Sequence, residues 1–354
     1  MKVSDNIRRK ISGAWLGVCL TTVALTSCEP IYENEGDCTA YYYVDFMYDR
    51  NMKFADAFSA EVEAVRLYVF DDEDKFVLQT SEQGDALKRD DYRMKLDLEA
   101  GRYTLVAWCD LGGKNESYTL PDMTAGVSTL QELTCRLDDR TRDEDLVKVG
   151  EIDDLYHGMM TVDLPDTYGE HNYTMSLTKN TNYVRVVLQH LSGKDIDKDD
   201  FIFTITDNNG LLNYDNTLLD DELLTYHAWY TSQGTAGVTG TEETRGEITS
   251  VSVALAELTV NRLMTDENKE TKTMLTVTRS TPDENGTYPT VLSIPLVDYA
   301  LLVKGYYNKD LDDQEYLDRQ DEYNLTFFLD DNNNWVSSSI IINSWRGGLS
   351  DVEM

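Results

Sequence analysis

The chain has 354 residues, of which 41% are hydrophobic, and its formal net charge at pH 7 is −34. This hydrophobic content is sufficient for folded cores, and the length predicts two domains. The acidic balance excludes nucleic acid as a partner, because binding phosphates requires a cationic surface.

The amino terminus has the layout of a secretory signal. Residues 1–10 carry four basic side chains, and residues 11–25 form an uncharged apolar stretch. That stretch is shorter than the roughly 20 residues that a membrane-spanning helix needs. It ends in Leu25-Thr26-Ser27-Cys28, which resembles the bacterial lipobox, where a signal peptidase cuts before a lipid-bearing cysteine. We therefore expect residues 1–27 to be removed and Cys28 to be the lipidation site. The alternative is an ordinary signal peptide with an incidental cysteine.

The first domain is predicted from residue 40 to residue 165, after an acidic tether over residues 28–39. Alternating apolar and polar side chains, bounded by turns, indicate short strands. These strands are predicted at residues 41–48, 64–70, 75–78, 94–98, 103–108, 130–137 and 159–164. The charged residues 136–149 favour an exposed loop, and the turn-forming residues 165–169 give the domain boundary.

The second domain is predicted from residue 166 to residue 354. Its strands are expected at residues 173–177, 183–191, 201–206, 251–260, 273–278, 291–302, 323–329 and 335–343. The Gly- and Thr-rich residues 231–245 indicate a long loop, and residues 310–320 a short helix. Many short strands between turn signals predict an all-β chain made of β-sandwiches.

Three cysteines remain after signal removal and lipidation of Cys28, namely Cys38, Cys109 and Cys135. Export to an oxidising compartment permits one disulfide and one leftover thiol. The alternative is that all three are reduced and buried, where they behave as small apolar residues. Zinc is a poor interpretation, because the chain has no CxxC pair and its four histidines are dispersed.

The sequence resembles the lipid-anchored accessory subunits of type V fimbriae of Bacteroidetes. The resemblance runs over nearly all of the mature chain. The segments that carry it are Cys38 and residues 48–52 (YDRNM), 54–58 (FADAF), 65–70 (VRLYVF), 100–109 (AGRYTLVAWC), 155–158 (LYHG), 316–319 (YLDR) and 342–345 (INSW).

This resemblance implies two tandem transthyretin-like, Greek-key β-sandwich domains. It implies a structural subunit that anchors a fimbria to the outer membrane through lipid on Cys28 and helps to terminate assembly. Its partners would be other fimbrial subunits, joined by β-strand addition. The family pattern also implies a disulfide between Cys38 and Cys109, which leaves Cys135 free. The acidic residues 29–37 resemble surface-export signals, which favours the exterior of the outer membrane.

Catalytic motifs are absent from the sequence: it has no GxSxG, HExxH or phosphate-binding GxxxxGK[ST] pattern. We therefore predict no enzymatic activity and no cofactor. Asp195, Asp197 and Asp199 alternate like the start of a calcium loop, but the sixth-position glycine and twelfth-position glutamate are missing. A solvated turn is the favoured interpretation of this segment.

The alternative function is a surface lipoprotein that binds a glycan or a host protein. Tyr226, Trp229 and Tyr230, beside the Gly- and Thr-rich segment, would suit such a site. Packing against a core is the favoured interpretation of these rings, because tyrosine and tryptophan often lie half-buried.

Overall fold

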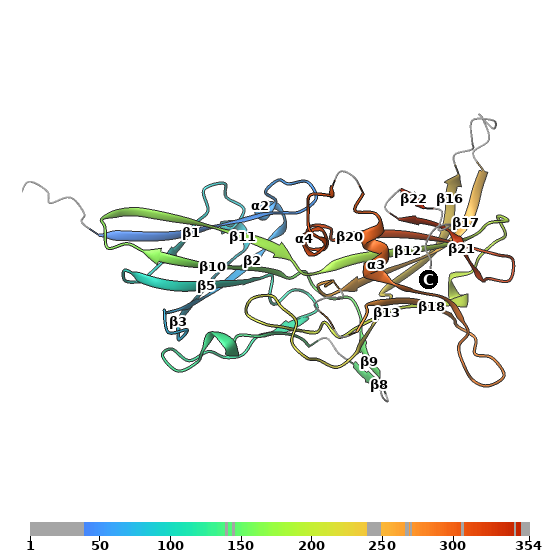
Figure 1. Cartoon of the computed structure of the whole chain (residues 1–354), viewed down its shortest axis with the longest axis horizontal. Coiled ribbons are helices and arrows are strands. Elements are labelled where there is room, and N and C mark those ends of the chain that lie inside the picture. Colours follow the sequence, from blue (N-terminus) through green and yellow to red (C-terminus); the bar gives the residue numbers. More distant parts are fainter. Residues whose placement is uncertain are drawn as a thin grey trace, which may run out of the picture.

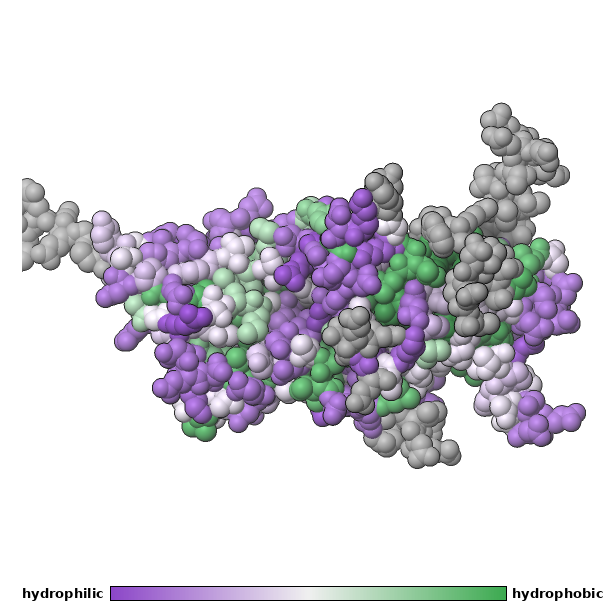
Figure 2. Space-filling view, viewed as in Figure 1, coloured by the Kyte–Doolittle hydropathy of each residue, from purple (hydrophilic) through white to green (hydrophobic). Residues whose placement is uncertain are grey.

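The computed structural model describes residues 39–138, 141–143, 146–238, 249–265, 269, 271–305, 308–342 and 345–347. It is an elongated molecule with two β-rich halves arranged end to end (Figure 1). In these ranges no helix is long and apolar enough to cross a membrane. Hydrophilic residues cover most of one face of the first half (Figure 2).

The first half is a single seven-stranded sheet in the order β3-β2-β5-β10-β11-β1-β4. Its strands are β1 (Ala40–Arg50), β2 (Ala64–Phe70), β3 (Phe76–Gln83), β4 (Met94–Leu96), β5 (Gly101–Cys109), β10 (Tyr156–Leu164) and β11 (Gly169–Lys179). Strand β10 pairs with β5 over nine residue pairs but with β11 over only two. The sheet therefore divides there into two layers, and one core lies between them.

Alternation of side chains explains how β1 fills that core. Tyr42, Val44, Phe46 and Tyr48 are buried, whereas the residues between them are partly exposed. Successive strand residues point to opposite faces, so one apolar set faces inward. Helix α2 (Phe58–Glu61) contributes Phe58, which stacks on Phe46 with ring centroids 5.7 Å apart.

The second half is a sandwich of two six-stranded sheets, in the orders β16-β17-β12-β20-β21-β22 and β19-β18-β13-β15-β9-β8. The first of these sheets contains β12 (Asn182–His190), β16 (Tyr230–Val238), β17 (Thr249–Val260), β20 (Glu322–Leu329), β21 (Trp335–Ile342) and β22 (Trp345–Gly347). The second contains β8 (Thr141–Asp143), β9 (Leu146–Val149), β13 (Phe201–Asp207), β15 (Leu224–His227), β18 (Met274–Arg279) and β19 (Thr290–Pro295). Inward residues of both sheets belong to one buried cluster.

Smaller elements complete the second half. A three-stranded sheet contains β6 (Tyr118–Thr119), β7 (Cys135–Leu137) and β14 (Leu211–Leu212). The helices of this half are α3 (Leu296–Leu302) and α4 (Asp313–Arg319), with the 3-10 turns η3 (Leu130–Glu132) and η4 (Lys198–Asp200). The 3-10 turn η2 (Gly84–Ala86) belongs to the first half, between β3 and β4. The all-β class with two tandem sandwiches is thus confirmed.

The two halves share buried side chains rather than meeting at a loose linker. Phe70, Val106 and Trp108 lie on the outer face of the first sheet, yet they belong to the core cluster of the second half. The segment between β5 and β10 explains this. Its strand β7 pairs with β14, and its strand β9 pairs with β15.

The predicted domain boundary at residues 165 and 166 needs correction. Strand β11 follows that point, yet it pairs in parallel with β1 of the first sheet. The change of sheet falls instead at Asn180 and Thr181, because β12 starts at Asn182 in the second half. The turn residues 165–169 mark only the connection from β10 to β11.

Three further segments differ from the sequence-based expectation. Residues 231–245 were expected to form a loop, but β16 continues to Val238; residues 239–248 lie outside the described ranges. Residues 291–302 form β19 and then helix α3, because an apolar run fits either structure. Residues 136–149 hold β8 and β9 and the buried Val149.

Candidate functional site

Segments that are far apart in the sequence meet at the junction between the two halves. Tyr48, at the end of β1, packs edge-on against Tyr156, at the start of β10, with ring centroids 5.1 Å apart. From α4 of the second half, Arg319 donates to the carbonyl oxygen of Asp49 at 3.0 Å. The same guanidinium lies over the ring of Phe54, 4.6 Å from its centroid. The junction therefore unites the sequence segments 48–58, 155–158 and 316–319.

Gly158 lies on β10 against two side chains of β11. A Cβ atom placed there would lie 2.7 Å from Cδ2 of Leu177 and 2.8 Å from the sulfur of Met175. Both neighbours are buried. A side chain at position 158 would therefore require these two side chains to move.

Lys179 places one buried cation on one side of the junction. It is the last residue of β11, and its side chain is only 7% exposed. Its Nζ lies 3.4 Å from Asp154, 3.5 Å from Asp321 and 3.9 Å from Glu61. Asp154 and Glu61 come from the first half of the chain and Asp321 from the second. One ammonium thus balances part of the charge of three carboxylates across the joint.

Two tyrosines complete this Lys179 cluster. The Tyr183 hydroxyl donates to Asp154 at 2.9 Å, and the Tyr156 hydroxyl donates to Glu61 at 3.3 Å. Burial, with nearby carboxylates, raises the pKa of both phenols above the ordinary value, so both remain neutral donors. The Lys179 ammonium lies over both rings, 5.2 and 5.6 Å from their centroids.

Arg262 provides the buried cation on the other side. Its Nε and Nη2 donate to the two carboxylate oxygens of Asp318 at 2.9 and 2.7 Å, and both side chains are 11% exposed. Arg262 also donates to the carbonyl of Asn216. The Asn216 amide exchanges hydrogen bonds of 2.8 and 2.9 Å with the amide of Asn180. This set ties the residues between β11 and β12 to helix α4.

His157 lies beside this Arg262 cluster without charge. Its Nε2 is 2.8 Å from the carbonyl oxygen of Tyr214, and its ring lies 4.5 Å from that of Trp108. Burial lowers the pKa of His157 to about 4. The imidazole is therefore neutral near pH 7 and acts as a packed hydrogen-bonding group.

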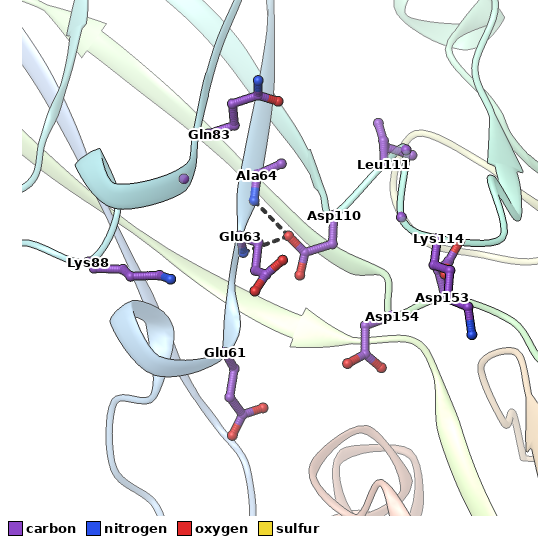
Figure 3. A pocket seen from close by; sticks show the side chains of 13 residues that line it. Glu61, Glu63, Ala64, Gln83, Lys88, Asp110, Leu111, Lys114, Asp153 and Asp154 are labelled. Atoms are coloured by element: carbon purple, nitrogen blue, oxygen red, sulfur yellow. Dashed lines mark hydrogen bonds between the residues drawn. The ribbon is translucent and has the colours of Figure 1, made fainter.

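An acidic cleft of about 700 Å³ opens next to the Lys179 cluster (Figure 3). Its charged lining residues are Glu61, Glu63, Lys88, Asp110, Lys114, Asp153 and Asp154. Oδ1 of Asp110 accepts backbone hydrogen bonds from Glu63 at 2.8 Å and Ala64 at 2.7 Å. Burial nevertheless raises the pKa of Asp110 to about 6. Five of these seven charged side chains are carboxylates, so the cleft is predominantly acidic.

Cys28 and Cys38 lie outside the described residues. The lipidation of Cys28 and the expected Cys38–Cys109 disulfide therefore stay predictions. Cys109 ends β5 and Cys135 begins β7, and both side chains are buried.

Two of the three calcium candidates, Asp197 and Asp199, make local contacts. Oδ1 of Asp197 accepts from the backbone of Asp199 at 3.0 Å and caps η4. The Asp199 carboxylate pairs with Lys198, and Asp195 precedes the buried Ile196. Within the described residues, no three His, Cys, Asp or Glu side chains are arranged to hold a metal.

The three aromatic candidates separate into different roles. Tyr226 is fully buried, and its hydroxyl donates to Asn209 at 2.6 Å. Trp229 and Tyr230 are exposed. The predicted core role therefore holds for Tyr226 but not for the other two. Lys179 and Arg262 were not predicted from the sequence, because their partners lie in distant segments of the chain.

Comparison with known proteins relates the chain to fimbrial anchor proteins and to adhesin-like proteins. The family model of fimbrillin-A associated anchor proteins Mfa1 and Mfa2 matches residues 34–346. No curated protein matches the chain. The chain is 34% identical to a Bacteroides thetaiotaomicron protein provisionally described as an adhesin, over 89% of this chain and 99% of that one, with a TM-score of 0.75.

Two other solved structures resemble the chain. A second Bacteroides thetaiotaomicron structure, provisionally described as polysaccharide-binding, is 32% identical over 88% of this chain and 99% of that one, with a TM-score of 0.72. The fimbrial anchor protein Mfa2 of Porphyromonas gingivalis is 18% identical over 88% of this chain and 99% of that one, with a TM-score of 0.62. At 18% identity, the similarity to this Porphyromonas gingivalis protein shows a shared fold only.

Proposed function

The chain belongs to the family of fimbrillin-A associated anchor proteins Mfa1 and Mfa2, and from that premise we propose that it fastens a fimbria to the outer membrane through lipid on Cys28. Membership makes it a fimbrial accessory protein of the cell surface that associates with other fimbrial subunits. The family is one of structural and anchoring proteins rather than of enzymes. The lipid, the outer membrane and a role in terminating assembly are the proposal.

The shared core of the two halves is the observation that supports this function best. An anchor must hold a membrane at one end and a polymer at the other without separating between them. Strand β1, which begins at Ala40, starts near one tip of the molecule, and the second half forms the opposite end (Figure 1). Cys28 precedes Thr39 by eleven residues, which reach at most about 40 Å. The first half would therefore stay near the membrane.

Other fimbrial subunits are proposed to join by β-strand addition at the second half. Strands β16 and β19 lie at the edges of its two sheets and have nine and six residues. An edge strand offers backbone groups to an added strand, and alternate side chains set the register. This end also lies far from the proposed lipid.

Replacement of Cys28 tests the anchoring function. Cys28→Ala should move the protein and its fimbriae from the outer-membrane fraction into the medium, because two or more acyl chains give stable attachment. Cys19→Ala, in the expected signal segment, is the matched control and should leave attachment unchanged. The measurement is fractionation with labelling by a palmitate analogue. Continued membrane attachment of Cys28→Ala, with fimbriae in place, would refute lipid anchoring.

A second function, binding of carbohydrate, has a specific observation in its favour. The second Bacteroides thetaiotaomicron structure described above, 32% identical to this chain, is provisionally described as polysaccharide-binding. In this chain, Trp229 is a 39% exposed tryptophan that lines a groove. Binding of the folded exported protein to immobilised glycans is the direct test of this function.

A further inference from the structure

Trp229 lies where the chain passes from one sheet of the second half to the other. Strand β15, which ends at His227, pairs with β13, whereas β16, which starts at Tyr230, pairs with β17. Between them, the backbone N–H of Trp229 donates to the carbonyl of Glu257 at 3.1 Å. Trp229 is therefore held by the sandwich itself and not by a long loop.

Two adjacent aromatic rings are exposed at this crossing. Trp229 is 39% exposed and Tyr230 47%, and their ring centroids lie 6.0 Å apart. A tryptophan is normally among the more buried residues of a fold. Leaving part of the ring in water forgoes hydrophobic stabilisation of about 25 cal/mol for each exposed Å². A ligand that covered the ring would recover this stabilisation.

A polar row crosses the sheet beside these rings. Glu257, Arg185 and Asn324 are register neighbours on β17, β12 and β20. The Arg185 side chain donates from Nε and Nη2 to one oxygen of Glu257, at 3.0 and 2.6 Å. With Tyr183 and Trp229, these residues line a groove of about 270 Å³.

The groove combines the two features by which a sugar is recognised. One face of a pyranose ring presents C–H groups, which pack on an aromatic ring, and its edge presents hydroxyls, which both donate and accept. Ligand sites commonly join an aromatic surface to a few fixed polar groups. The carboxylate of Glu257, the guanidinium of Arg185 and the amide of Asn324 together offer acceptors and donors.

The charge and the volume of the groove restrict which sugars it can bind. Two carboxylates, Glu257 and Glu322, line the groove with one guanidinium, and the whole chain carries −34. Sialic and uronic acids would be repelled by this field. The volume lies just below the usual range of about 300–1,000 Å³ for sites of drug-sized ligands, which matches a single hexose better than a long oligosaccharide.

We propose that this groove binds one neutral hexose unit of a glycan, with Trp229 as the stacking surface and Arg185, Glu257 and Asn324 as the hydroxyl partners. This proposal rests on the proposed carbohydrate-binding function and assigns that function to the Trp229 groove. It is independent of the anchoring function, because Cys28 has no part in it.

Glycan binding by the folded exported protein tests the proposal. The probes are immobilised mannose-, galactose- and N-acetylglucosamine-terminated oligosaccharides and the sialylated forms of the galactose series. Wild type should bind at least one neutral probe and lose binding when that probe is sialylated. Trp229→Ala should weaken binding about tenfold or more, whereas Trp229→Phe should retain most of it. Tyr288→Ala removes another exposed ring, on the β18–β19 connection, and should leave glycan binding unchanged.

The possible outcomes distinguish an error about this groove from an error about carbohydrate binding as a whole. Neutral-glycan binding that survives Trp229→Ala would overturn this groove while leaving carbohydrate binding intact. No binding by wild type to any probe would overturn both. Thermal unfolding of each variant accompanies the measurement, and a Trp229→Ala protein that melts within a few degrees of wild type attributes the loss to the ring. If Trp229→Ala unfolds, Asn324→Ala is the substitute, and unchanged binding by that variant also counts against the site.

Discussion

On one side of the junction, Lys179 faces three carboxylates at 3.4–3.9 Å. On the other side, Arg262 forms two hydrogen bonds of 2.9 and 2.7 Å with the single carboxylate of Asp318. The first is a loose cluster with excess negative charge beside an open cleft. The second is a planar pair with matched charge and fixed geometry. The two sides should therefore respond differently to loss of a partner.

Loss of Asp318 should have the largest effect. Asp318→Ala leaves the guanidinium of Arg262 nearly buried and without its counter-ion, and removal of one partner from a buried pair costs about 3–5 kcal/mol. Denaturant unfolding measures this loss. The double variant Arg262→Met with Asp318→Leu should regain most of it, because the desolvated charge is also removed. A single variant within about 1 kcal/mol of wild type would show that the pair does not hold the junction.

Loss of Lys179 should cost about 3 kcal/mol. Lys179→Met leaves Glu61, Asp154 and Asp321 facing one another, and like charges at this distance repel. These carboxylate side chains are 38%, 31% and 28% exposed, so water screens them and the loss should be smaller than that of Asp318→Ala. Denaturant unfolding measures both variants, and a larger loss for Lys179→Met would remove the distinction between the two sides.

Asp110 should produce a smaller effect of opposite sign. Its pKa is raised from 3.8 to about 6 by burial, so the folded state favours the protonated form. That stabilisation is complete below the unfolded pKa and is lost as the pH rises through about 6, which amounts to about 2–3 kcal/mol. Asp110→Asn can still accept from Glu63 and Ala64. It should be more stable than wild type at pH 7 and nearly equal to it below pH 4 in denaturant titrations.

Arg319 should give the smallest effect. Arg319→Ala removes the contact with the ring of Phe54 and the hydrogen bond to the carbonyl of Asp49. We expect a loss of about 1–2 kcal/mol. Arg319→Lys keeps the charge but not the planar stack, so it should recover only part of that loss. Full recovery by lysine in thermal unfolding would assign the contact to charge alone.

Strands were predictable where apolar side chains alternate along the sequence. The predicted strand Ala64–Phe70 has the limits that the structure shows, although Tyr68 and Phe70 on its other face are buried as well. The four inward residues of β1 follow the same alternation. Strand β16 was missed because its Gly- and Thr-rich residues show no alternation, and pairing with β17 makes it a strand all the same. Residues 296–302 were predicted to be part of a strand but form helix α3. The apolar residues of the run LVDYALL fit the two-residue spacing of a strand as well as the 3.6-residue spacing of a helix.

The junction was predictable only as a set of segments. The sequence singled out residues 48–58, 155–158 and 316–319 without indicating that they touch. Contacts such as Arg319 with Asp49 join residues 270 positions apart, and no local pattern encodes such a pairing.

The passage of β11 into β12 has a mechanical consequence for a protein pulled at both ends. If tension enters at Thr39, β1 is drawn toward its start, while β11 is drawn toward β12 and the second half. The two strands are parallel neighbours over nine residue pairs, so the load acts along them in shear. All of those hydrogen bonds must then yield together, whereas an unzipping geometry would break them one at a time. Parallel pairing of β12 with β20 over eight residue pairs repeats the arrangement beyond the junction.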